Sequence, residues 1–143
     1  MEESRRAKRA SKKAKRSGPL ADVDQEPVDY NRSTPKFCFG FLQPDYDISA
    51  LNSTQRDNFA MALHNRSKMT WQQIILGGRR GLGQENIAKA SIRGSIPSRF
   101  VEEKDFIALR YSDRLRMVGT RSLDTFHVLW IERRYGDLYD HGS

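Results

Sequence analysis

Two histidines and a row of arginines near the C-terminus are the side chains best suited to chemistry on a phosphodiester. Free histidine has a pKa of about 6.5, which suits proton transfer near neutral pH, and His127 and His141 are the candidates. Alternation over residues 114–120 puts Arg114 and Arg116 on one face of a predicted strand, where they form a cationic stripe. Histidine can act as a base or an acid, and arginine can stabilise negative charge that develops on a phosphate. We therefore expect acid–base chemistry without a metal or another cofactor.

Simpler interpretations of the reactive side chains stay open. His127 stands between two apolar residues of a predicted strand, a position typical of a packed histidine with one hydrogen bond. His141 is two residues from the end of the sequence, where an exposed side chain is common. The single cysteine, Cys38, stands between two phenylalanines and indicates a core thiol, with a nucleophile as the alternative. Its isolation is typical of a protein from a reducing compartment.

Eight positive charges lie within twelve residues near the N-terminus, separated only by Ala and Ser. They are Arg5, Arg6, Lys8, Arg9, Lys12, Lys13, Lys15 and Arg16. Such a tail has no apolar face to bury, so we expect it to be disordered alone. Because its contacts with phosphates release counterions, we expect the tail to bind nucleic acid with an affinity that falls steeply with salt and depends little on sequence. The alternatives are a solubilising tail, a nuclear-localisation signal and a contact with acidic membranes.

A glycine-rich segment over residues 77–83 places Arg79 and Arg80 among four glycines. Freedom of the backbone together with guanidinium groups favours close approach to a phosphate. The segment is neither a Walker A loop nor a dinucleotide-binding fingerprint, because no Lys-Ser/Thr pair ends it and a predicted helix precedes it. A solvated connector is the alternative interpretation.

The elements that position these side chains are predicted to form one compact α+β domain over residues 37–143, after a tail and linker over residues 1–36. Asn52 or Ser53 is expected to cap a first helix, and Thr70 a second, short one. The predicted strands are 37–42, then an antiparallel meander of 106–111, 114–120 and 126–132, with 138–139 as a short final strand. The strand over 126–132 is apolar on both faces and should be central, whereas 84–103 is expected to be mostly extended loop.

The order of strand, two helices, glycine-rich loop and meander resembles the RelE/HigB-like toxins of bacterial toxin–antitoxin systems, over residues 37–140. The resemblance implies a compact endoribonuclease that cleaves messenger RNA, free or ribosome-bound, and is neutralised by an antitoxin protein. It further implies that Arg116 and Arg121 bind phosphate. His127, Tyr139 and His141 fall where that family has its acid and base groups.

Composition and net charge are consistent with three hypotheses for function. A chain that is 37% hydrophobic and 30% charged fits a soluble, cytoplasmic domain with a polar extension, and no apolar run is long enough to span a membrane. The net charge of +7 divides into +4 on residues 1–36 and +3 on residues 37–143, which favours a nucleic-acid partner, RNA before DNA. The first hypothesis is a metal-independent endoribonuclease. The others are a non-catalytic nucleic-acid- or ribosome-binding module and a protein-interaction factor that docks through residues 84–103.

Overall fold

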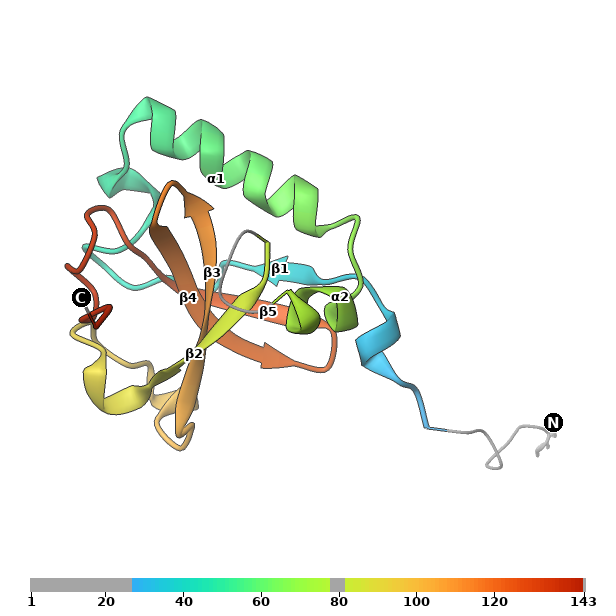
Figure 1. Cartoon of the computed structure of the whole chain (residues 1–143). Coiled ribbons are helices and arrows are strands. Elements are labelled where there is room, and N and C mark those ends of the chain that lie inside the picture. Colours follow the sequence, from blue (N-terminus) through green and yellow to red (C-terminus); the bar gives the residue numbers. More distant parts are fainter. Residues whose placement is uncertain (1–26, 78–81, 143) are drawn as a thin grey trace, which may run out of the picture.

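The computed structural model describes residues 27–77 and 82–142, which form a mixed α+β fold (Figure 1). Its helices are α1 (Ser53–Arg66) and α2 (Trp71–Leu76). Its strands are β1 (Lys36–Cys38), β2 (Gln84–Ala88), β3 (Asp105–Ser112), β4 (Leu115–Ser122) and β5 (Thr125–Ile131). The cations of the N-terminal tail, together with Arg79 and Arg80, lie outside the described residues. What the sequence predicts for them stays a prediction.

One sheet of five strands has the order β1-β5-β4-β3-β2. Strands β3, β4 and β5 form the predicted antiparallel meander, and β1 pairs with β5 in parallel. The prediction that the last long strand lies inside the sheet is confirmed, since β5 has a neighbour on each side. Asp113 and Leu123 take positive φ angles of 51° and 59° in the two turns of the meander, which gives the tight reversals that these short connections need.

Both helices begin at the residues that the sequence predicts. The Asn52 side chain accepts the N–H of Gln55 at 2.8 Å, and the Gln55 side chain accepts the N–H of Asn52 at 2.9 Å. Thr70 and Gln73 make the same reciprocal pair before α2, which ends at Gly77. These capping boxes satisfy donors that a helix start leaves open. Within the described residues, neither helix has the length and apolar character to cross a bilayer.

The sheet carries a hydrophobic core on each face. The helix-side core lies under α1 and α2 and contains Leu51, Phe59, Ala62, Trp71, Ile74, Leu109, Tyr111, Met117, Phe126, Val128 and Ile131. The loop-side core lies under irregular segments and contains Ile87, Phe100, Phe106, Ala108, Val118, Leu129, Trp130, Leu138 and Tyr139. In Figure 1, α1 crosses one face of the curved sheet while the loops and the C-terminal segment cover the other. Apolar side chains are therefore needed on both faces of the inner strands.

Three predictions about strands are wrong in part. The first strand ends at Cys38 because residues 39–42 turn away from the sheet. Residues 84–88 form strand β2 on the edge of the sheet, where the sequence predicts mostly extended loop. Residues 138–139 form no strand, although Leu138 and Tyr139 are buried in the loop-side core. Strand β2 was not predicted because its sequence alternates only weakly between apolar and polar residues. Residues 138–139 are apolar because they are buried in the core, although they pair with no strand.

A register shift makes the faces of β5 depart from strict alternation. Strict alternation puts Trp130 on the same face as Phe126 and Val128, yet the structure places Trp130 in the loop-side core and Ile131 in the helix-side core. The pairing of β4 with β5 shifts next to Gly119, which leaves one extra residue in β5. Such a bulge reverses the faces of all residues beyond it.

Candidate functional site

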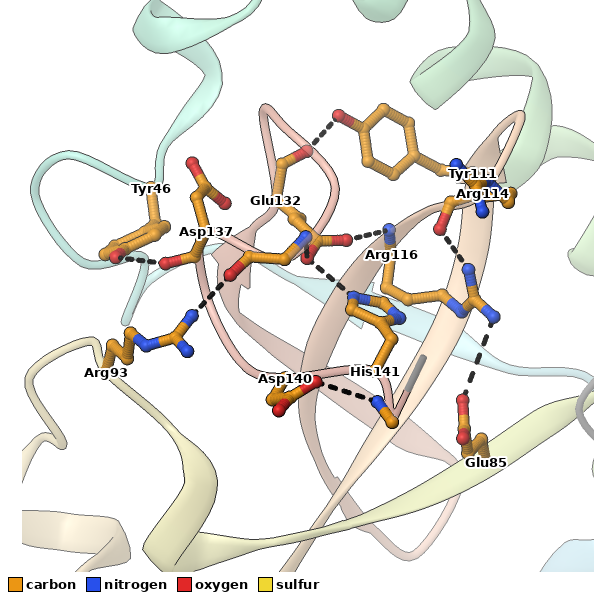
Figure 2. Close-up of polar contacts among 12 residues, drawn as sticks. Tyr46, Glu85, Arg93, Tyr111, Arg114, Arg116, Glu132, Asp137, Asp140 and His141 are labelled. Carbon is orange, nitrogen blue, oxygen red and sulfur yellow. Dashed lines mark hydrogen bonds and ion pairs between the residues drawn. The ribbon is translucent and has the colours of Figure 1, made fainter.

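A fully buried carboxylate paired with a histidine forms the polar centre at the end of β5. Glu132 is 0% exposed, and its Oε2 lies 2.7 Å from Nε2 of His141 (Figure 2). The same oxygen accepts the N–H of Gly136 at 2.9 Å, while Oε1 accepts the N–H of Arg116 at 3.2 Å. Glu132 therefore joins β4, the turn after β5 and the end of the described chain through one side chain.

The local sequence explains why Glu132 meets His141. Strand β5 ends at Ile131, and the N–H of Glu132 still donates to the Arg116 carbonyl at 2.9 Å, which fixes the residue just beyond the end of this inner strand. Gly136 has a φ of 87°, a conformation that glycine adopts without strain, and turns the chain back so that its N–H faces the carboxylate. The C-terminal segment, residues 132–142, then returns His141 to the same carboxylate.

Aromatic rings hold the histidine in place. The His141 ring stacks between Tyr135 and Tyr139, with centroids 4.1 Å away on each side. The Arg114 guanidinium covers the Tyr135 ring at 4.0 Å, so four planar groups follow one another. Only 2% of the His141 side chain is exposed. The stack fixes the plane of the imidazole, and a bond to Glu132 fixes its rotation.

Burial controls the ionisation of two neighbours of His141. It raises the pKa of Glu132, and hydrogen bonds from His141 and from the N–H groups of Gly136 and Arg116 offset part of that effect. Burial also raises the pKa of the Tyr139 hydroxyl, and the Glu85 carboxylate adds to the shift. Tyr139 therefore keeps its proton and is a hydrogen-bond donor rather than a base.

Arg116 corrects the prediction of an exposed cationic stripe. Arg116 is only 3% exposed. Its Nη1 donates to the carbonyl of Arg114, and its Nη2 lies 3.8 Å from Oε1 of Glu85. Figure 2 shows the Arg116 side chain directed toward Glu85 on β2. Of the two arginines assigned to the stripe, only Arg114 presents its guanidinium at the surface. The alternation of residues 114–120 predicted the face of the strand on which Arg116 lies. It did not predict that the C-terminal segment buries this side chain.

A pocket of about 230 Å³ lies between β2 and the C-terminal segment, next to the pair of Glu132 and His141. Its lining includes Glu85, Asn86, Ser91, Tyr139, Asp140 and His141. Most of these polar side chains present hydrogen-bond acceptors. In the described part of the chain, no three His, Cys, Asp or Glu side chains gather in a way that could hold a metal ion.

The structure does not bring His127 to this site. His127 is 8% exposed and packs against the rings of Phe41 and Phe100, with centroids 5.8 and 5.6 Å away. Burial, followed by the charge of Arg99, lowers its pKa. Four residues of β5 lie between it and Glu132, a distance of roughly 15 Å. These surroundings favour the packed-histidine interpretation over a catalytic one.

Arg121 also lies elsewhere. Its guanidinium stacks on the Trp71 ring at 4.4 Å, on the helix side of the sheet, and its Nε donates to the carbonyl of Leu123 at 2.6 Å. Of the five predicted catalytic residues, the structure thus gathers Arg116, Tyr139 and His141. It leaves Arg121 and His127 apart from them.

Sequence reasoning missed the acidic members of the site. Glu132 could have been identified from the sequence, because it stands at the end of a strand that is apolar on both faces. A carboxylate buried at such a position needs a hydrogen-bonding or charged partner. Nothing in the sequence pointed to Glu85, since its segment was predicted to be mostly loop. Tyr135 was missed because only the fold brings it onto the ring of His141.

No protein-family model matches this sequence, and comparison with the curated proteins and with the solved structures gave no match either. The resemblance to RelE/HigB-like toxins therefore stays a prediction. Function has to be inferred from the geometry of the described residues.

Proposed function

We propose that this protein is a metal-independent endoribonuclease whose acid–base group is His141. The observation that carries the proposal is the 2.7 Å contact between Glu132 and His141 beside a pocket. A histidine held by a buried carboxylate is an arrangement suited to general base catalysis. Only 2% of the His141 side chain is exposed, so a substrate reaches it through the pocket.

The contact of Nε2 with Glu132 assigns the two ring nitrogens. When Glu132 is ionised, Nε2–H donates to it and Nδ1 carries the lone pair. Nδ1 takes the proton of the 2′-hydroxyl as the 2′ oxygen forms its bond to phosphorus and the bond to the 5′ oxygen breaks. The 5′ oxygen takes a proton from water, and the resulting hydroxide recovers the proton from His141. The products are a 2′,3′-cyclic phosphate and a 5′-hydroxyl.

Arg114 is the cation best placed to meet the phosphate. It is exposed, and its contact with Tyr135 holds the guanidinium one ring away from His141. Arg116 faces Glu85 and supports the site from inside, because its guanidinium is buried. The net charge of +7 on the whole chain favours association with RNA before any specific contact forms.

The test is cleavage of single-stranded messenger RNA by the full chain, alone and with translating ribosomes, in the presence of a chelator. We expect fragments that end in 2′,3′-cyclic phosphate. His141→Ala is expected to lower the rate about 100-fold or more, as loss of a general base does. His64→Ala is the matched control, because His64 is exposed on α1, away from the site.

Each outcome decides between hypotheses. Cleavage that survives His141→Ala in a folded variant would remove His141 from the reaction. RNA binding without cleavage by the wild-type chain would overturn the enzyme proposal and support the binding module. Circular dichroism and thermal unfolding of both variants establish that loss of activity is not loss of the fold.

A further inference from the structure

The end of β3 lies between α1 and the candidate site (Figure 1). Strand β2 pairs with β3 only as far as Leu109, so among the described strands β4 alone pairs with the residues beyond it. Tyr111 packs on the Phe59 ring of α1, with centroids 5.6 Å apart, and its hydroxyl donates to the Glu132 carbonyl. This end of β3 therefore adjoins the site, and no described strand pairs with its outer edge.

A second pocket, of about 370 Å³, lies between this end of β3 and α1. Its lining includes Asn58, Asn65, Arg110, Ser112 and Asp113. The Asn58 amide donates to the Ser112 hydroxyl at 2.9 Å, which joins α1 to β3 across the pocket. Guanidinium and amide groups both donate to phosphate oxygens in complexes with nucleic acids. The lining thus offers N–H donors, whereas the pocket beside His141 is rich in acceptors.

The Arg110 guanidinium makes no hydrogen bond or ion pair with any described residue. Its Nε is closed off from solvent, so the inner part of the side chain is packed in the fold. Its two terminal nitrogens are not among the closed-off atoms, so they reach solvent. A packed side chain loses less conformational entropy on binding than a wholly exposed one. Arg110 is therefore a preorganised cation that lacks an anion among the described residues.

A second arginine increases the need for that anion. Arg110 lies directly opposite Arg116 in the pairing of β3 with β4, so both side chains leave the same face of the sheet. Like charges in such positions destabilise a sheet. Arg116 has Glu85 as an ion-pair partner at 3.8 Å, whereas Arg110 has no such partner among the described residues. An anion bound by Arg110 would stabilise this arrangement.

We propose that Arg110 binds a phosphodiester group of single-stranded RNA that neighbours the cleaved one. The inference rests on the proposed function, which supplies the RNA and the reacting centre. Arg116 connects the two places, because it lies opposite Arg110 and donates its N–H to Glu132, the partner of His141. Terminal N–H groups of a guanidinium form charge-assisted hydrogen bonds with phosphate oxygens. Such a contact gives affinity and position but no base preference.

Asp113 is the opposing charge in this pocket. It is exposed in the turn after β3, and no ion pair joins it to Arg110 in the described part of the chain. Its carboxylate repels a phosphate, so its removal gives a test of opposite sign. Asp113→Asn is expected to tighten RNA binding about threefold, and asparagine suits the positive φ of 51° at this position. Weaker binding would contradict an anion in the pocket.

Binding of a 2′-O-methyl single-stranded RNA to the full chain tests the proposal without cleavage, because the 2′ oxygen is blocked. Fluorescence anisotropy at several salt concentrations gives the affinity and its salt dependence. Arg110→Gln is expected to weaken binding about tenfold. It should also reduce the slope of log affinity against log salt by about 0.7, the share of one phosphate contact on a single strand.

Arg56→Gln is the matched control. It removes the same charge from an exposed position of α1, and Arg56 stands two residues before Asn58, on another face of the helix. We expect it to leave the slope unchanged, because counterion release follows phosphate contacts rather than net charge. Equal changes of slope in Arg110→Gln and Arg56→Gln would overturn the proposal.

Thermal unfolding separates loss of binding from loss of the fold. Arg110→Gln relieves the repulsion of Arg116, so its unfolding midpoint is expected not to fall. Arg110→Lys keeps the charge and loses the planar fork, so it should retain the salt slope while binding RNA several-fold more weakly. A slope that falls as much in Arg110→Lys as in Arg110→Gln would contradict a phosphate contact.

The failures of the two proposals are distinguishable. RNA binding that depends on Arg110, without cleavage of unmodified RNA, would keep the phosphate site and overturn the nuclease. Cleavage that depends on His141, with the same RNA affinity in Arg110→Gln and Arg56→Gln, would keep the nuclease and overturn the phosphate site. No binding of RNA by the wild-type chain would overturn both.

Discussion

The two histidines that the sequence singles out lie near opposite ends of β5, one among aromatic rings and the other beside a carboxylate. Near the start of the strand, His127 packs against Phe41 and Phe100, and burial lowers its pKa. Just after the end of the strand, Glu132 binds His141 at 2.7 Å. One histidine packs against rings near the cation Arg99, whereas the other contacts a carboxylate.

This difference shows that residue type alone does not decide chemistry. A neutral imidazole inside an aromatic cluster is a packing group, because charging it would leave an uncompensated charge in an apolar place. An imidazole held by a carboxylate can gain and lose a proton while its partner compensates the charge. The contrast between the aromatic end and the acidic end of β5 is the basis for the predictions below.

The largest effect is expected at the bulge that separates the two ends. A Cβ on Gly119 would lie 1.8 Å from the carbonyl oxygen of His127, a backbone atom that cannot move alone. Gly119→Ala should therefore lower the free energy of unfolding by about 4 kcal/mol, measured by urea unfolding. Gly40→Ala is the matched control, since its Cβ would meet only the Cys38 sulfur, at 3.7 Å. Equal losses in the two variants would contradict the close packing at the bulge.

A smaller loss is expected from the acidic end. Glu132→Leu leaves the imidazole of His141 and the N–H groups of Gly136 and Arg116 without their acceptor. We expect a loss of about 3 kcal/mol in the free energy of unfolding, as for other buried pairs broken from one side. Lys36→Gln removes the exposed partner of Asp124 and should cost much less, because this ion pair is open to solvent. If both variants lose the same amount, Glu132 is not the centre of the site.

Most of the fold could be predicted because its signals are local. The capping pairs at Asn52 and Thr70 and the apolar run of β5 each depend on a few adjacent residues. Strand β2 could not be predicted, since Gln84–Ala88 has little alternation and is stabilised by pairing with β3. The face of Trp130 was missed because a bulge is set by the partner strand rather than by β5 itself.

The site was predictable in part for a related reason. Tyr139 and His141 are close in sequence, so the sequence shows their proximity, and Arg116 belongs to a strand that alternation places correctly. Glu132 and Glu85 join them only through tertiary contacts, across the turn after β5 and across the sheet. No periodicity encodes such contacts. The sequence therefore predicted Arg116, Tyr139 and His141, and it missed Tyr135 and the two carboxylates.

The smallest effect is expected at the aromatic end and appears in the dependence of stability on pH. The pKa of His127 is lowered in the fold, so between about pH 6.5 and the folded pKa the unfolded chain binds more protons. The contribution of His127 is thus full above about pH 6.5 and is lost as pH falls, by at most about 1.4 kcal/mol per pH unit. His127→Leu should flatten the fall in the free energy of unfolding between pH 7 and 5, measured by urea unfolding, whereas His64→Gln should not. An unchanged slope in His127→Leu would assign the acid sensitivity to the acidic end instead.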